Sequence, residues 1–177
     1  MNENLPCIIT VAITGSIPKK IDNPTIPITV SEQIESTRKC YDAGASLVHL
    51  HVRNEDESPS SDVNKFKELL VGIKESCPNI IIQFSTGGRG RSQQERGLML
   101  TLKPDMASLA TGSVNFPTSI YENHPSLINE LAQSMLKYSI KPEIEIFDLA
   151  MLYNAFKMVK EGFLLEPIHV QFVFGIK

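Results

Sequence analysis

The alternation of short β-branched runs with longer segments of helical periodicity constrains the fold of this chain more than any other feature. Six apolar runs have the length and composition of buried strands, at residues 7–13, 46–52, 80–85, 106–110, 143–147 and 168–174. Five helical segments lie between these runs, and successive strands start about 32 residues apart, the size of one βαβ unit. This pattern predicts repeated βα units around a parallel sheet.

Six strands and five helices predict an incomplete (β/α)8 TIM barrel, which has eight strands and about 250 residues when complete. The chain has 177 residues, so we expect one domain over residues 1–177 that covers the N-terminal two-thirds of a barrel, with the C-terminal part missing. A barrel without its last strands would leave a sheet edge unpaired. Two capping-box patterns, Thr29 with Glu32 and Ser92 with Glu95, predict helix starts.

Charge and composition exclude several classes of partner. The 17 basic and 20 acidic residues give a net charge of −3, so nucleic acid is not an expected partner. No apolar run approaches the roughly 18 residues of a membrane span, and the polar N-terminus is unlike a signal peptide. Three cysteines share no metal-type or disulfide-type spacing. We therefore expect a cytoplasmic protein with reduced thiols and no membrane partner.

The segment LVHLHVR at 47–53 carries the clearest chemical signal, because side chains alternate between the two faces of a strand. The apolar residues at 48, 50 and 52 suit a helix-covered face. His49 and His51 then share the opposite face, with Cβ atoms about 7 Å apart, and both rings can reach one zinc ion. The alternative is a pair of hydrogen-bonded core histidines, since a catalytic zinc usually needs a third protein ligand.

The segment QFSTGGRGR at 83–91 places glycines at the end of a strand, where backbone amides can approach an anion closely. Gln83 and Ser85 share the inward face. The segment lacks the Lys-Ser/Thr of a P-loop and does not match a dinucleotide fingerprint, so a carboxylate or phosphate site is favoured over a nucleotide site. The alternative is a glycine-rich turn with solvated arginines.

The segment PEIEIFD at 142–148 directs Glu143 and Glu145 inward, whereas the two isoleucines face the helices. Buried carboxylates are costly unless they are paired or bound to a cation. Glu145, nearer the C-terminal end, is a candidate for proton transfer or for holding a polar group of the substrate, and a structural salt bridge is the alternative. Asp148 fits a helix N-cap. The segment at 106–116 ends in small and polar residues, which suits either a substrate cavity or a polar loop.

Several motifs in register carry a resemblance to a known family: AITG at 12–15, GA at 44–45, HLH at 49–51, STGG at 85–88, KP at 103–104, GSVNF at 112–116 and PEIE at 142–145. In order and spacing the chain resembles the β-keto acid cleavage enzymes, whose named representative is the 3-keto-5-aminohexanoate cleavage enzyme. The resemblance spans essentially the whole sequence.

The resemblance implies a zinc-dependent (β/α)8 barrel that uses acetyl-CoA as co-substrate to cleave a β-keto acid, releasing acetoacetate and a new CoA thioester. It also implies a homo-oligomer. By resemblance His49 and His51 are the metal ligands and Glu145 belongs to the catalytic network. The residues implied to contact the substrate are Ser85, Thr86, Gly87, Gly88 and Ser108.

The chain departs from the family pattern in three places. Ser16 and Ile17 replace an Ala-Glu pair whose carboxylate would bind a substrate ammonium, so we expect a different keto acid. Ala110 replaces an asparagine. The segment with a Glu that completes the zinc site, and with a catalytic Arg and Asp, is expected beyond Lys177. Two alternatives stay open: a metal-dependent aldolase or isomerase of the same barrel class, and a non-catalytic remnant or half-barrel that needs a partner chain.

Overall fold

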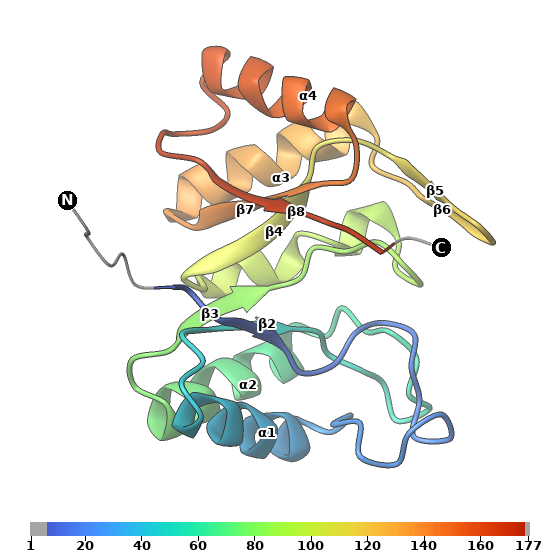
Figure 1. The fold of residues 1–177 in the computed structure, drawn as a ribbon, viewed down its shortest axis with the longest axis vertical. Helices are drawn as coiled ribbons and strands as arrows, with labels where there is room; N and C mark the ends of the chain where they lie inside the picture. Colours follow the sequence, from blue (N-terminus) through green and yellow to red (C-terminus); the bar gives the residue numbers. More distant parts are fainter. Residues whose placement is uncertain (1–6, 176–177) are drawn as a thin grey trace.

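The computed structural model describes residues 7–175 and contains a curled, six-stranded parallel sheet in the order β1-β2-β3-β4-β7-β8 (Figure 1). The six observed strands all overlap the predicted runs, and the fourth matches at both ends. The strands are β1 (Thr10–Ala12), β2 (Leu47–Leu50), β3 (Ile81–Phe84), β4 (Met106–Ala110), β7 (Lys141–Ile146) and β8 (His169–Phe172). This arrangement confirms an α/β fold built as a parallel half-barrel. The remaining strands of a full barrel stay a prediction.

Four α-helices cover the outer face of the sheet, α1 and α2 over one half and α3 and α4 over the other (Figure 1). They are α1 (Val30–Asp42), α2 (Val63–Ser76), α3 (Pro125–Tyr138) and α4 (Leu149–Lys160). The predicted capping box at the start of α1 is confirmed, because the Glu32 amide donates to Thr29 Oγ1 at 3.2 Å and the Thr29 amide donates to Glu32 Oε2 at 2.9 Å. Within the described residues, no helix has the length and apolar character that a bilayer crossing requires.

The connection between β3 and β4 differs from the predicted fifth helix. It forms two short 3-10 turns, η1 (Gln93–Glu95) and η2 (Leu98–Leu102). The Ser92–Glu95 pair does form, with the Ser92 amide donating to Glu95 at 3.0 Å. A regular helix cannot continue, because Gly97 lies only two residues after Glu95. At the end of η2, Lys103 is in a left-handed conformation (φ 54°) and Pro104 follows it. The prediction of a regular helix was wrong here.

The polar segment after β4 forms an antiparallel hairpin that the sequence did not indicate. Its strands are β5 (Val114–Phe116) and β6 (Ser119–Tyr121), with Phe116 paired to Ser119 across a two-residue turn. The hairpin stands apart from the main sheet (Figure 1). It carries Phe116 and Tyr121 together, with ring centroids 6.2 Å apart.

The apolar core lies between the sheet and the helices, in two clusters. Val48 and Leu50 of β2 are fully buried and belong to the cluster that contains Phe66 and Ile73 of α2. The second cluster joins the isoleucines of β7 to α3 and α4. The apolar residues of β2 and of β7 therefore face the helices, as predicted. The polar residues of these two strands lie on the concave face of the sheet.

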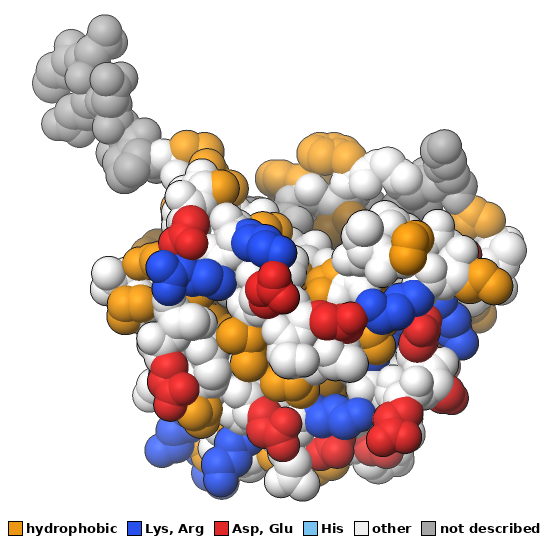
Figure 2. Space-filling view, turned by 90° about the horizontal axis from the view of Figure 1, so that it is seen from below, with side chains coloured by type: hydrophobic (Ala, Val, Ile, Leu, Met, Phe, Trp, Pro, Cys, Tyr) orange, Lys and Arg blue, Asp and Glu red, His pale blue; other side chains and the backbone are white. Residues whose placement is uncertain are grey.

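The face seen from below in Figure 2 has acidic and basic side chains interspersed, without a large patch of one sign. Helix α1 carries two exposed ion pairs, Arg38 with Asp42 at 2.9 Å and Lys39 with Glu35 at 2.7 Å. Such exposed pairs contribute little to stability, because water and salt screen them.

Candidate functional site

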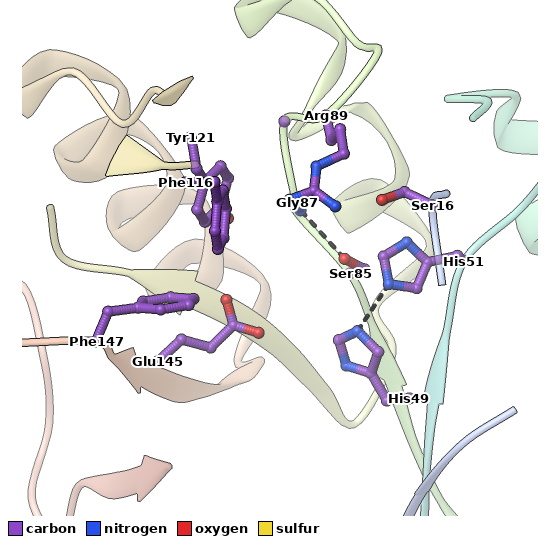
Figure 3. Close-up of a pocket in the computed structure, with 11 residues that line it drawn as sticks. Ser16, His49, His51, Ser85, Gly87, Arg89, Phe116, Tyr121, Glu145 and Phe147 are labelled. Atoms are coloured by element: carbon purple, nitrogen blue, oxygen red, sulfur yellow. Dashed lines mark hydrogen bonds between the residues drawn. The ribbon is translucent and has the colours of Figure 1, made fainter. Parts of the chain in front are cut away.

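Two histidine rings meet on the concave face of the sheet. His49 lies on β2, and His51 is the first residue after that strand. Side chains alternate between the two faces of an extended chain, so both rings lie on the same side. Their Nε2 atoms are 3.1 Å apart and their ring centroids are 5.0 Å apart (Figure 3). The predicted convergence of the two imidazoles is therefore confirmed.

Gln83 orients the first of these rings. Parallel pairing sets Gln83 directly beside His49, and Gln83 Oε1 contacts His49 Nδ1. Since an amide oxygen only accepts hydrogen bonds, Nδ1 carries the proton and Nε2 keeps its lone pair. Burial lowers the pKa of His49. The pKa of His51 lies well below its usual value, mainly because the ring is buried and secondly because a proton there would be repelled by a protonated His49. Both rings are therefore neutral near pH 7, as metal ligation requires.

The glycine turn after β3 forms the adjacent wall. The Gly87 amide donates to Ser85 Oγ at 3.2 Å. Two arginines brace the turn by donating to its backbone carbonyls: Arg91 to Ser85 (3.2 Å) and Gly87, and Arg96 to Thr86 (2.7 Å). Arg91, one of the two arginines in the solvated-arginine alternative, is instead half-buried and bonded to the turn.

Gly88 has no room for a side chain. A Cβ atom there would lie 2.8 Å from Arg96 Nη1, and that guanidinium is held in place by donating to Glu122 O at 2.8 Å and Asn123 Oδ1 at 2.6 Å. We expect Gly88→Ala to lower the free energy of unfolding by about 2 kcal/mol through overpacking. Urea unfolding followed by circular dichroism measures this change.

Gly15→Ala is the matched control, because a Cβ at Gly15 meets nothing within 4 Å. Equal stability of the two variants would show that the turn accommodates a methyl group and that the close packing of Gly88 on Arg96 is unimportant.

Glu145 reaches the same cavity from β7. Burial, and secondly the charge of Glu143, raise the pKa of Glu145 to about 7, against a lowering effect of Arg96. Glu143 behaves differently, since it pairs with His169 Nε2 at 3.2 Å. Glu145 makes no ion pair with an arginine or lysine among the described residues, so it is left able to exchange a proton near neutral pH.

This raised pKa couples stability to pH. The folded chain holds the Glu145 proton up to about pH 7, whereas a free carboxyl releases it near 4.5. Stability therefore falls as pH rises from about 4.5 to 7 and is level above that range. We expect Glu145→Gln to be more stable than wild type by about 3 kcal/mol at pH 8 and similar to it at pH 4. Urea titrations at both pH values measure the difference, and an identical pH dependence in both proteins would contradict the raised pKa.

The histidines, the glycine turn and Glu145 surround one open cavity with an empty volume of about 490 Å³ (Figure 3). The lining residues are Ser16, His49, His51, Ser85, Gly87, Gly88, Arg89, Phe116, Tyr121, Glu145 and Phe147. Six of the eight predicted site residues are among them. The other two, Thr86 and Ser108, bond to each other, with Thr86 Oγ1 donating to Ser108 O at 2.6 Å and the Thr86 amide donating to Ser108 Oγ at 3.2 Å. Their contact with a substrate stays a prediction.

A sequence model of the family described as beta-keto acid cleavage enzyme matches residues 6–177. The chain belongs to the beta-keto acid cleavage enzyme family. The family resemblance inferred from the motifs is thereby confirmed, and so is the assignment to a family of enzymes.

Some relatives of this family member act with acetyl-CoA, according to their names. A 3-oxoadipate:acetyl-CoA acetyltransferase of Cupriavidus necator is 60% identical over 172 residues, covering 97% of this chain and 61% of the relative. A 3-keto-5-aminohexanoate cleavage enzyme of Acetoanaerobium sticklandii is 43% identical over 171 residues, covering 96% of this chain and 63% of the relative. The chain thus spans less than two-thirds of the length of these relatives.

A solved structure shows the same fold. The ternary complex of ObcA with a C4-CoA adduct and oxalate superposes with a TM-score of 0.77 at 22% identity, over 86% of this chain and 38% of ObcA. This likeness supports the half-barrel as the arrangement that this family member shares with a larger chain.

The part of the chain that the structure describes has no group of three or more His, Cys, Asp or Glu residues arranged to hold a metal. The imidazoles of His49 and His51 nevertheless suit one shared ion. Both are neutral, and their Nε2 atoms, 3.1 Å apart, are close enough to ligate one zinc at the usual bond length of about 2.1 Å. This family member therefore supplies two candidate protein ligands from residues 7–175.

Five lining residues were not predicted as site residues: Ser16, Arg89, Phe116, Tyr121 and Phe147. Arg89 and Phe116 belong to motifs that the sequence analysis singled out, and Ser16 occupies the place of a family residue, so each had a signal. Tyr121 had no such signal in the sequence, because the β5–β6 hairpin is what brings it to the cavity.

Proposed function

We propose that this chain carries the keto-acid half of the active site of a zinc-dependent beta-keto acid cleavage enzyme. The reaction joins a β-keto acid R–CO–CH2–COO⁻ with acetyl-CoA and yields acetoacetate and the thioester R–CO–S–CoA. One observation carries the proposal: two neutral, convergent imidazoles, a glycine turn and a carboxyl with a pKa of about 7 line the same cavity.

His49 and His51 would hold the zinc ion through their Nε2 atoms. A zinc ion bound there supplies a Lewis acid that polarises the substrate's keto and carboxylate oxygens. Gln83 contributes by fixing the His49 ring, since its amide oxygen accepts from Nδ1 and directs Nε2 toward His51. The binding of zinc is supported by the donor atoms and their spacing.

The glycine turn and Glu145 have separate tasks in the proposed reaction. Ser85, Gly87 and Gly88 line the cavity, and the Ser85 hydroxyl, which accepts from the Gly87 amide at 3.2 Å, keeps its proton to donate to the substrate's first carboxylate. The Glu145 carboxylate accepts a proton from the methylene carbon between the ketone and that carboxylate. A pKa near the working pH suits this group to taking the proton and returning it later.

The proposed reaction is tested by supplying the purified chain with zinc, acetyl-CoA, a panel of β-keto acids and the segment of the Cupriavidus necator relative that this chain does not cover, and by measuring acetoacetate. Acetoacetate formed only in the presence of acetyl-CoA supports the proposal. Cleavage without acetyl-CoA would instead indicate an aldolase of the same barrel class. No acetoacetate from any member of the panel, with zinc confirmed bound, would reject the assignment for this chain.

A second candidate is a half-barrel that functions only with a partner chain. It is favoured by exposed apolar side chains beside the last strand: Phe172 is 54% exposed, Phe174 88% and Leu149 64%. Unpaired strand edges with such residues readily pair with another chain. Light scattering of the isolated chain tests this candidate, and a stable monomer that binds zinc would count against it.

A further inference from the structure

Arg89 places a positive charge on the cavity wall (Figure 3). Its guanidinium carbon lies over the Phe116 ring, 4.7 Å from the ring centroid, at the distance of a cation–π contact. Over residues 7–175, none of the ion pairs and none of the side-chain hydrogen bonds involve this guanidinium. Arg89 thus offers its donors to the cavity.

The neighbouring arginines differ from Arg89 in having partners within the protein. Arg91 donates to the carbonyls of Ser85 and Gly87, and Arg96 donates to backbone carbonyls and an amide oxygen behind the turn. They brace the glycine turn, and neither is among the residues that line the cavity. The three cations together give this end of the cavity a positive potential.

Little negative charge opposes this potential. Among the described lining residues the one carboxyl is Glu145, whose pKa of about 7 keeps it partly protonated at neutral pH. Ser16 lines the cavity with an uncharged hydroxyl. The cavity is therefore suited to a substrate with more than one negative charge and unsuited to one that carries an ammonium group.

Aromatic side chains complete the wall beside Arg89. Phe116 and Tyr121 come from the hairpin and Phe147 follows β7, with ring centroids 6.1–6.2 Å apart. Such a wall suits the methylene groups of a short aliphatic chain. These rings lie across the cavity from the histidines (Figure 3), so they would face a ligand that reaches from the histidines to Arg89.

We propose that Arg89 binds the second, distal carboxylate of a dicarboxylic β-keto acid, while the ketone and first carboxylate lie at His49, His51 and the glycine turn. Arginine matches a carboxylate with two parallel N–H donors, which makes it a selective receptor for this group. This inference rests on the proposed function and deepens it by naming the substrate class and the residue that selects it.

The test measures binding rather than turnover, by titration calorimetry on the purified chain with zinc supplied and without acetyl-CoA. The ligands are 3-oxoadipate and 3-oxohexanoate, which differ in the distal carboxylate alone. We expect wild type to bind 3-oxoadipate about 10- to 100-fold more tightly, and Arg89→Gln to remove this preference. Arg89→Lys retains part of it, because the charge stays while the paired donors are lost.

Arg38→Gln is the matched control, since Arg38 lies on the surface of α1 and pairs with Asp42 at 2.9 Å. It should leave the preference unchanged. Equal wild-type affinity for the two ligands, or an equal loss of both in Arg89→Gln, would overturn the inference. A preference that Arg89→Gln removes, without acetoacetate production, would uphold the inference and reject the proposed reaction. Acetoacetate production without a preference for 3-oxoadipate would uphold the proposed reaction and reject the inference about Arg89.

Discussion

Replacing His49 and His51 together with Ala will abolish zinc retention, with a loss of affinity of at least about 100-fold. The reason is that their Nε2 atoms, 3.1 Å apart, form the one pair of convergent nitrogen donors in the cavity among the described residues. Competition with a chromogenic zinc chelator measures the affinity of wild type and variant. The cleavage reaction should disappear with the metal.

The control for this experiment is His124→Asn. His124 lies at the N-cap of α3, away from the cavity, and accepts from the Ser126 amide at 3.3 Å, a role that asparagine can also fill. This variant should bind zinc as wild type does. Unchanged zinc affinity in the double His variant, with its circular dichroism spectrum preserved, would show that the two rings are structural core histidines.

Replacing Glu145 with Gln will lower kcat by about 10²- to 10⁴-fold, the usual contribution of a general base. The side chain keeps its size but can no longer accept a proton from the substrate's methylene carbon. The rise of the rate with pH centred near 7, which reflects loss of the Glu145 proton, should also vanish. Rates of acetoacetate formation between pH 5 and 9 measure both effects.

Glu130→Gln provides the control, because Glu130 is exposed on α3. A Glu145→Gln variant with unchanged kcat and an unchanged pH profile, but a raised KM, would assign Glu145 to holding a polar group of the substrate. The same substitution is expected to raise stability at pH 8. Loss of rate with gain of stability would therefore separate a catalytic role from a structural one.

The parts of the site that were predictable follow from the periodicity of strands. Alternation along β2 put His49 and His51 on one face, and alternation along β7 directed Glu145 inward, because apolar neighbours had to face the helices. Those inferences needed no knowledge of distant contacts. The distance between the rings and the raised pKa of Glu145 depend on packing from several elements, so local pattern could not supply them.

Other parts of the fold were not predictable for equally definite reasons. The η1–η2 connection carries a helix-start signal, yet Gly97 and Pro104 stop regular helix within a few residues. The hairpin lacks the Asn-Gly or Asp-Gly turn that usually marks one, so its aromatic residues had no visible place in the site. Arg89 lies in the glycine-rich segment, but the local sequence pattern did not indicate whether its side chain points into the cavity or into solvent.

The sequence by itself determined the βα order, the faces of the strands and the residues that could bind a metal ion and a carboxylate, because these depend on local periodicity and chemical type. Tertiary structure alone decided which of three neighbouring arginines faces the cavity, which of two inward glutamates is paired, and which aromatic rings line the wall. These outcomes depend on contacts between residues far apart in the chain, since burial and charge act through space.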